Sequence, residues 1–106
     1  MKLEIKTERM QFMVAKPAEP KSDGRGGQKN DRETRELLWV VELVAMDETG
    51  AEVIKVTTAG QQPPRVVPGQ HVQVTGLVAF PWAIEDKHGV AYRATGITPL
   101  KQPAAA

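Results

Sequence analysis

The sequence predicts an all-β protein, a small Greek-key barrel of five strands. Three observations predict it: five segments with strand-type patterning, turn signals between them, and no segment typical of a stable helix. A small SH3-like barrel or an open sandwich is the alternative for the same elements. Closure into a barrel is favoured because it protects a very apolar second strand from pairing with other chains.

The first strand is expected over residues 2–15, long or bulged, because apolar residues alternate with charged ones. These apolar positions are Leu3, Ile5, Met10, Phe12 and Val14. Residues 16–36 follow with prolines, glycines and many charges but few apolar side chains. Such a segment cannot bury enough surface to offset its ordering entropy, so a flexible loop is predicted there.

The second and third strands are expected over 37–46 and 51–59, joined by a turn at 47–50. Trp39 shares a face with Val41, Leu43 and Ala45, and this face is favoured as the core because the opposite face carries Glu42. That opposite face would expose valines 40 and 44, which indicates a partner surface such as a subunit interface.

The last two strands are expected over 70–80 and 90–98. Pro68–Gly69 forms a turn before the first of them, and Gly76 in its middle permits a bend or a close backbone approach. The strand leads into Phe80-Pro81-Trp82, and Tyr92-Arg93-Ala94-Thr95-Gly96-Ile97 follows ten residues later.

This C-terminal half resembles the last hairpin of the OB-fold in bacterial single-stranded DNA-binding proteins, with a G-x-x-V-x-V-x-G strand, an aromatic-bearing loop and a Y-x-x-x-x-I strand. The resemblance implies a single OB-fold domain over 1–100 and assembly as a homodimer or tetramer. A helix commonly lies between the third and fourth strands of these proteins, whereas residues 59–65 are too short and proline-rich for one.

The resemblance also implies binding of single-stranded DNA with low sequence specificity. The chain ends in Pro-Ala-Ala-Ala without the acidic tip of the housekeeping members, so an accessory role is expected, in replication, recombination or plasmid and mobile-element maintenance. Residues 101–106 are expected to form a disordered tail. RNA stays possible as the ligand, because no feature of the sequence reads a 2′-hydroxyl group.

The composition excludes some classes of protein but does not indicate a function. The formal net charge is +1, with 14 basic and 13 acidic residues, so nucleic-acid binding would depend on local charge and on aromatic stacking. The chain has no cysteine, an N-terminus unlike a signal peptide, and no apolar run of the roughly 20 residues that span a bilayer. A cytoplasmic protein without membrane contact is therefore expected.

Catalysis is not expected, and neither a metal nor a cofactor is predicted. The two histidines, His71 and His88, lie on different elements, and the adjacent Glu85 and Asp86 would point apart. The segment Gly24–Gly27 superficially resembles a phosphate-binding loop but lacks the Lys-Ser/Thr pair that follows in such loops.

Candidate nucleic-acid contacts are basic residues on the long loop and third strand, with aromatic and basic residues around the final hairpin. They are Lys21, Arg25, Lys29, Arg35, Lys55, Phe80, Trp82, Lys87, Tyr92 and Arg93. Tyr92 and Arg93 should point to opposite sides, and whether the long loop contacts ligand is open. Trp39 and Trp82 could each be core or binding residues. The alternative function is an OB-fold protein–protein interaction module that binds no nucleic acid.

Overall fold

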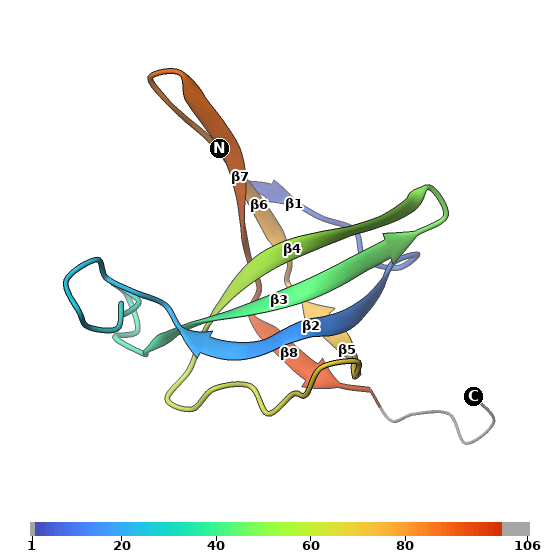
Figure 1. The fold of residues 1–106 in the computed structure, drawn as a ribbon, viewed down its shortest axis with the longest axis horizontal. Coiled ribbons are helices and arrows are strands. Elements are labelled where there is room, and N and C mark those ends of the chain that lie inside the picture. Colours follow the sequence, from blue (N-terminus) through green and yellow to red (C-terminus); the bar gives the residue numbers. More distant parts are fainter. Residues whose placement is uncertain (1, 101–106) are drawn as a thin grey trace.

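The computed structural model describes residues 2–100 and contains one sheet of eight strands, with no helix among these residues. The strands are β1 (Leu3–Glu4), β2 (Gln11–Pro20), β3 (Leu38–Asp47), β4 (Gly50–Ala59), β5 (His71–Thr75), β6 (Val78–Ile84), β7 (Lys87–Arg93) and β8 (Gly96–Pro99). The sheet is curled into a half-barrel, and the β6–β7 hairpin projects from it (Figure 1). The all-β prediction is confirmed, whereas the predicted count of five strands is wrong.

The strand count differs because three expected strands are interrupted. The expected 70–80 strand divides into β5 and β6 at Gly76, and the expected 90–98 strand divides into β7 and β8 beside Thr95. Gly76 has a φ of +63°, and the Thr95 amide donates to the Thr75 carbonyl at 2.9 Å. The expected 2–15 strand divides into β1 and β2 around a turn at 7–10.

The order of strands in the sheet is β1-β6-β7-β4-β3-β2-β5-β8. Neighbours are antiparallel except for β4 and β7, which are parallel. The chain runs from β5 into β6 and from β7 into β8, so each of these short connections joins strands from opposite halves of the order. This connectivity requires the sheet to curl.

The core lies on the concave side of the curled sheet. Its largest fully buried side chains are Leu43, Val14, Val41, Val56 and Val72. The predicted inward face of the second strand is confirmed, since Val41, Leu43 and Ala45 are buried. Trp39 is half-buried on the same side and donates its Nε1–H to the Gly60 carbonyl at 2.9 Å, so it has a structural role.

The flexible loop predicted over 16–36 starts too early, because β2 continues to Pro20. Beyond Val14 this strand is paired only with β3, with register shifts on both sides of Lys16. Prolines 17 and 20 are compatible with such a strand, because an edge position requires no ladder amide on its free side. The sequence pattern does not reveal which side of a strand is unpaired.

The loop itself, residues 21–37, is folded back on the barrel by backbone hydrogen bonds. The Lys29 amide donates to the Lys21 carbonyl at 2.8 Å, and the Leu38 amide donates to the Lys29 carbonyl at 2.9 Å. The predicted tail, residues 101–106, lies outside the described residues. No helix in the described part of the chain is long and apolar enough to cross a membrane.

Candidate nucleic-acid interface

The side of the sheet that points away from the core forms one continuous surface, which we call the outer face. On β3 and β4 its members include the pairs Val40–Thr57, Glu42–Lys55 and Val44–Val53. Thr57 is paired in parallel with Arg93 of β7, and paired residues project to the same side of a sheet. Lys55 and Arg93 therefore both lie on the outer face.

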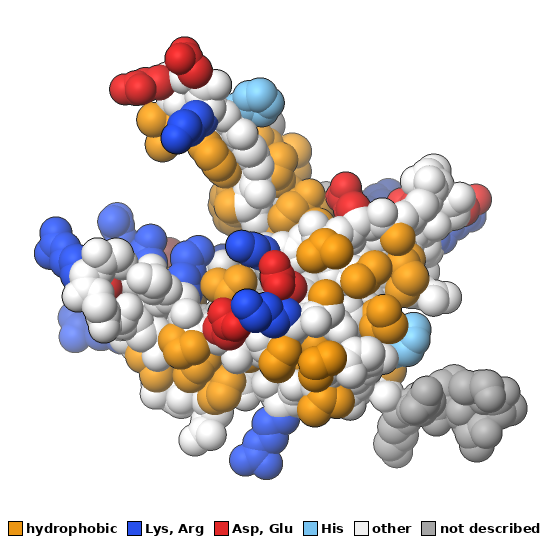
Figure 2. Space-filling view, viewed as in Figure 1, with side chains coloured by type: hydrophobic (Ala, Val, Ile, Leu, Met, Phe, Trp, Pro, Cys, Tyr) orange, Lys and Arg blue, Asp and Glu red, His pale blue; other side chains and the backbone are white. Residues whose placement is uncertain are grey.

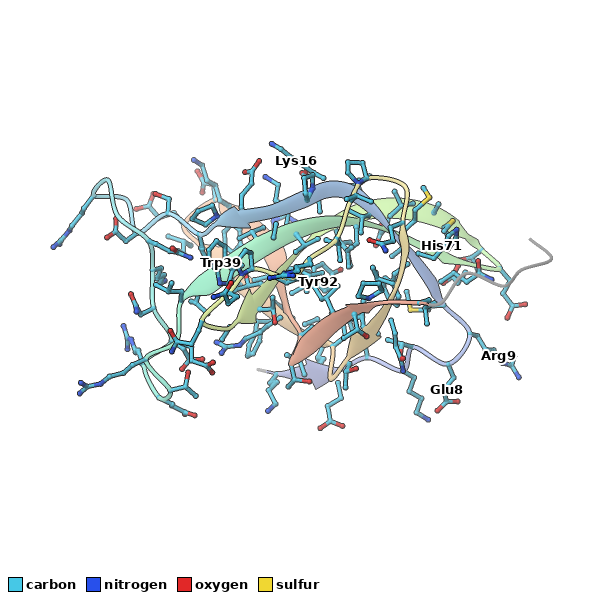
Figure 3. The ribbon with its side chains drawn as sticks, turned by 90° about the horizontal axis from the view of Figure 1, so that it is seen from below. Glu8, Arg9, Lys16, Trp39, His71 and Tyr92 are labelled. Carbon is cyan, nitrogen blue, oxygen red and sulfur yellow. The ribbon has the colours of Figure 1, made fainter. Side chains whose placement is uncertain are left out.

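Tyr92 lies on the opposite side of β7. It is paired with the fully buried Val56 and packs against the hydrophobic core. Figure 3 shows Lys16 extending away from the ribbon while Tyr92 and Trp39 lie within the body of the molecule. The prediction that Tyr92 and Arg93 point apart is confirmed, and Tyr92 does not share the surface of the other candidate residues.

The outer face continues from Arg93 onto the projecting hairpin. Going out along the hairpin, the pairs on this side are Val78–Arg93, Phe80–Ala91, Trp82–Gly89 and Ile84–Lys87. Phe80, Trp82 and Ile84 therefore form a row, which we call the aromatic row, opposite small residues and Lys87. Figure 2 shows hydrophobic side chains gathered along the hairpin.

Trp82 is not a core residue, since 44% of its surface is exposed. Its indole ring lies over Gly89, where an added Cβ would be only 2.7 Å from Trp82 Cζ2. Glycine at this position lets the ring lie flat on the hairpin backbone. The core alternative considered for Trp82 is thus excluded, and the exposed ring is available for stacking.

Three cations meet where the loop crosses β4 and β7. Lys21 donates from Nζ to Thr57 Oγ1 at 3.1 Å, and Thr57 is the β4 neighbour of Arg93. Burial lowers the pKa of Lys21, and the charges of Lys29 and Arg93 lower it further. We call Lys21, Lys29 and Arg93 the cationic cluster.

Asp31 is a residue of this site that the sequence did not indicate. Its side chain is 9% exposed and pairs with the Arg93 guanidinium through Oδ2. Its Oδ1 accepts from the amides of Glu33 at 2.8 Å and Thr34 at 3.3 Å. The Arg93 hydrogen bond and these amides hold the Asp31 pKa below its usual value. The sequence Asp-x-Glu is compatible with an Asx turn at Asp31. No local signal indicates that Asp31 pairs with Arg93, which lies 62 positions away in the sequence.

A hollow of about 240 Å³ adjoins the cationic cluster on the outer face. It lies where the register of β2 shifts, and bulges of this kind re-aim side chains near binding sites. Its lining residues are Lys16, Pro17, Glu19, Pro20, Lys21, Ser22, Val40, Glu42 and Lys55. Lys16 Nζ forms a salt bridge with Glu19 Oε1 at 3.0 Å. This contact, together with the charge of Glu42, raises the pKa of Lys16.

The remaining candidate residues lie at the margins of this surface. Arg25 is exposed at the far end of the loop, where its amide donates to Asp23 Oδ1 at 2.6 Å. Arg35 is exposed with a φ of +63°, and Lys87 lies at the end of the hairpin. The structure thus brings together Lys21, Lys29, Lys55, Arg93, Phe80 and Trp82. Within residues 2–100 no group of acidic or histidine side chains is arranged to hold a metal.

The chain matches no protein-family model, no curated protein and no solved structure.

Proposed function

We propose that this protein binds single-stranded DNA with low sequence specificity through an OB-type barrel. The support for the barrel type is the connectivity. If β5–β6 and β7–β8 each count as one interrupted strand and β1 is set aside, five strands remain: β2, β3, β4 and the two interrupted ones. OB barrels bind oligonucleotides on the face of the second and third strands and on the loops after the first and fourth.

The observation that carries the proposal is the continuity of the outer face from cations to aromatic rings. Lys55, the cationic cluster and the aromatic row follow one another across β4, β7 and β6. Binding of single strands needs this combination, because cations neutralise the backbone while bases stack on aromatic faces. Backbone neutralisation and stacking on an aromatic face are available to every nucleotide, so low sequence specificity is expected. The absence of cysteine suits the reducing cytoplasm, the compartment that we propose.

The proposal predicts salt-sensitive binding of oligonucleotides. Each neutralised phosphate releases counterions, so the log–log slope of affinity against salt should be about −0.7 per phosphate contacted. The measurement is fluorescence anisotropy of labelled oligo-dT at two salt concentrations, with a mixed-sequence strand, an RNA strand and duplex DNA as competitors. Absence of binding at low salt would refute the proposal, and preference for RNA would reassign the ligand.

A second candidate function, a protein-interaction module, is favoured by a different part of the outer face. Met13, Val44 and Val53 form an apolar row across β2, β3 and β4, and Val53 is 60% exposed. Charges of both signs lie next to it in the Lys16–Glu42–Lys55 row, and Figure 2 shows this mixture in the middle of the face. Under the leading proposal we assign the same apolar row to the self-association expected of a homodimer or tetramer.

Sedimentation velocity at tens of micromolar tests this assignment. The wild-type protein should sediment as a dimer or larger species, and Val53→Lys should shift it toward monomer because the charge disrupts an apolar contact. Val67→Lys is the matched control, since Val67 is 61% exposed and lies outside the row. A wild-type monomer, or equal effects of the two substitutions, would count against self-association through this row.

A further inference from the structure

Arg93 lies on the outer face, where a ligand could contact it, but its guanidinium is already paired with a carboxylate of the protein. It lies on the outer face between Thr57 of β4 and Val78 of β6, and 41% of its side chain is exposed. Its partner, the Asp31 carboxylate, comes from the loop and is nearly covered. This ion pair and the Lys21–Thr57 hydrogen bond attach the loop to β4 and β7.

The surroundings of Arg93 carry more positive than negative charge. Lys21 donates to Thr57, the immediate neighbour of Arg93. The Lys29 amide donates to the Lys21 carbonyl at 2.8 Å, and the Lys29 charge helps to lower the pKa of Lys21. Among the residues named in these contacts, Asp31 is the carboxylate, whereas the cationic cluster supplies three cations. A guanidinium binds carboxylate and phosphate through the same fork of N–H donors, so the position of Asp31 Oδ2 is one that a phosphate oxygen can take.

We infer that the cationic cluster is a binding site for one backbone phosphate of the nucleic acid, and that Asp31 occupies it in the free protein as an internal competitor. The inference rests on the proposed function and adds a regulatory contact to it. Binding exchanges one anionic partner of Arg93 for another, and the loop loses its attachment to β7.

The two oxygens of Asp31 have separate roles, which makes the contact testable. Oδ1 caps the turn by accepting from the Glu33 and Thr34 amides, while Oδ2 pairs with Arg93. Asp31→Asn retains an oxygen for the cap and removes the charge that holds Arg93. Asp23→Asn is the matched control, because Asp23 Oδ1 also accepts from two loop amides, those of Arg25 and Gly27.

The expected result is tighter binding of oligo-dT by Asp31→Asn, by roughly threefold or more, with little change for Asp23→Asn. The salt dependence should also steepen in Asp31→Asn, because a solvent counterion, rather than the tethered Asp31 carboxylate, then leaves Arg93 when the phosphate binds. In an Arg93→Gln background, Asp31→Asn should give no gain. Thermal melting confirms that each variant is folded, and Asp31→Ser, which also keeps a capping oxygen, replaces Asp31→Asn if that variant is not.

Outcomes separate this inference from the proposed function. If the wild type binds oligo-dT but Asp31→Asn binds no tighter than Asp23→Asn, the internal competitor is refuted and the function stands. A gain that persists with Arg93→Gln also refutes it, because the effect would then be general charge removal. If no variant binds oligo-dT, the function fails. Titration with pyrophosphate, followed by the NMR signal of Arg93 Nε–H, then decides whether the cluster is an anion site at all.

Discussion

Replacing Trp82 with alanine should weaken binding of oligo-dT by roughly 1–3 kcal/mol while leaving the melting temperature nearly unchanged. The ring is 44% exposed and lies over Gly89 on the outer face, so its removal leaves no cavity in the core. What is lost is the stacking of a base on the indole. Oligo-dT affinity and thermal melting, measured on the same preparation, check both parts of the prediction.

Trp39 supplies the matched control, because it is the other tryptophan of the chain and faces inward. Trp39→Ala removes a half-buried ring and its hydrogen bond to Gly60, so a loss of about 3–5 kcal/mol in the free energy of unfolding is expected. The folded fraction should bind oligo-dT normally. Unchanged affinity of Trp82→Ala, or a stability loss as large as that of Trp39→Ala, would contradict the stacking role.

Gly76→Ala should cost about 2–5 kcal/mol in the free energy of unfolding, for two reasons that add. Residue 76 has a φ of +63°, and the left-handed conformation costs a residue with a Cβ about 1–2 kcal/mol. The added Cβ would also lie 2.6 Å from Thr95 Oγ1, which is held by its hydrogen bond to the Thr75 carbonyl, and such overpacking costs about 1–3 kcal/mol. Chemical denaturation measures the sum.

Gly69→Ala separates the two contributions. Gly69 has a φ of +85°, but nothing lies within 4 Å of an added Cβ, so only the conformational cost applies. In the Gly76→Ala background, Thr95→Ala should recover part of the steric cost because it removes Oγ1 and Cγ2. Equal losses for the two glycine variants, without rescue by Thr95→Ala, would show that the close approach of Thr95 to residue 76 adds nothing to the cost of Gly76→Ala.

The local sequence pattern predicted those features that depend only on residues close together in the chain. The inward face of β3 followed from the alternation of Val41, Leu43 and Ala45 with Glu42, because a strand with one charged face buries the other. The opposite directions of Tyr92 and Arg93 followed from the same alternation. Gly76 was predicted as a bend or close approach, and its positive φ and its contact with Thr95 agree.

The interruptions of the strands and the extent of β2 depended on partners far away in the sequence. Whether a strand continues past Gly76 depends on which strand it pairs with next, β2 and β8 before the break and β7 and β1 after it. Prolines 17 and 20 suggested a loop, but they lie where β2 has a single neighbour. Proline is compatible with a strand that is paired on one side only, and the periodicity of the sequence does not show where a strand lacks its second neighbour.

The sequence by itself determined the all-β class, the composition of the core face and the residue types around the final hairpin, because each follows from side-chain alternation and turn chemistry over a few residues. Only the tertiary structure decided that Trp82 lies outside the core on Gly89, that Phe80 and Trp82 share a face with Lys55 and Arg93, and that Asp31 pairs with Arg93. These relations depend on the register between β4, β7 and β6 and on the path of the loop. The β4–β7 pairing and the contact of the loop with β7 join segments far apart in the sequence, so a local stretch of sequence cannot specify them.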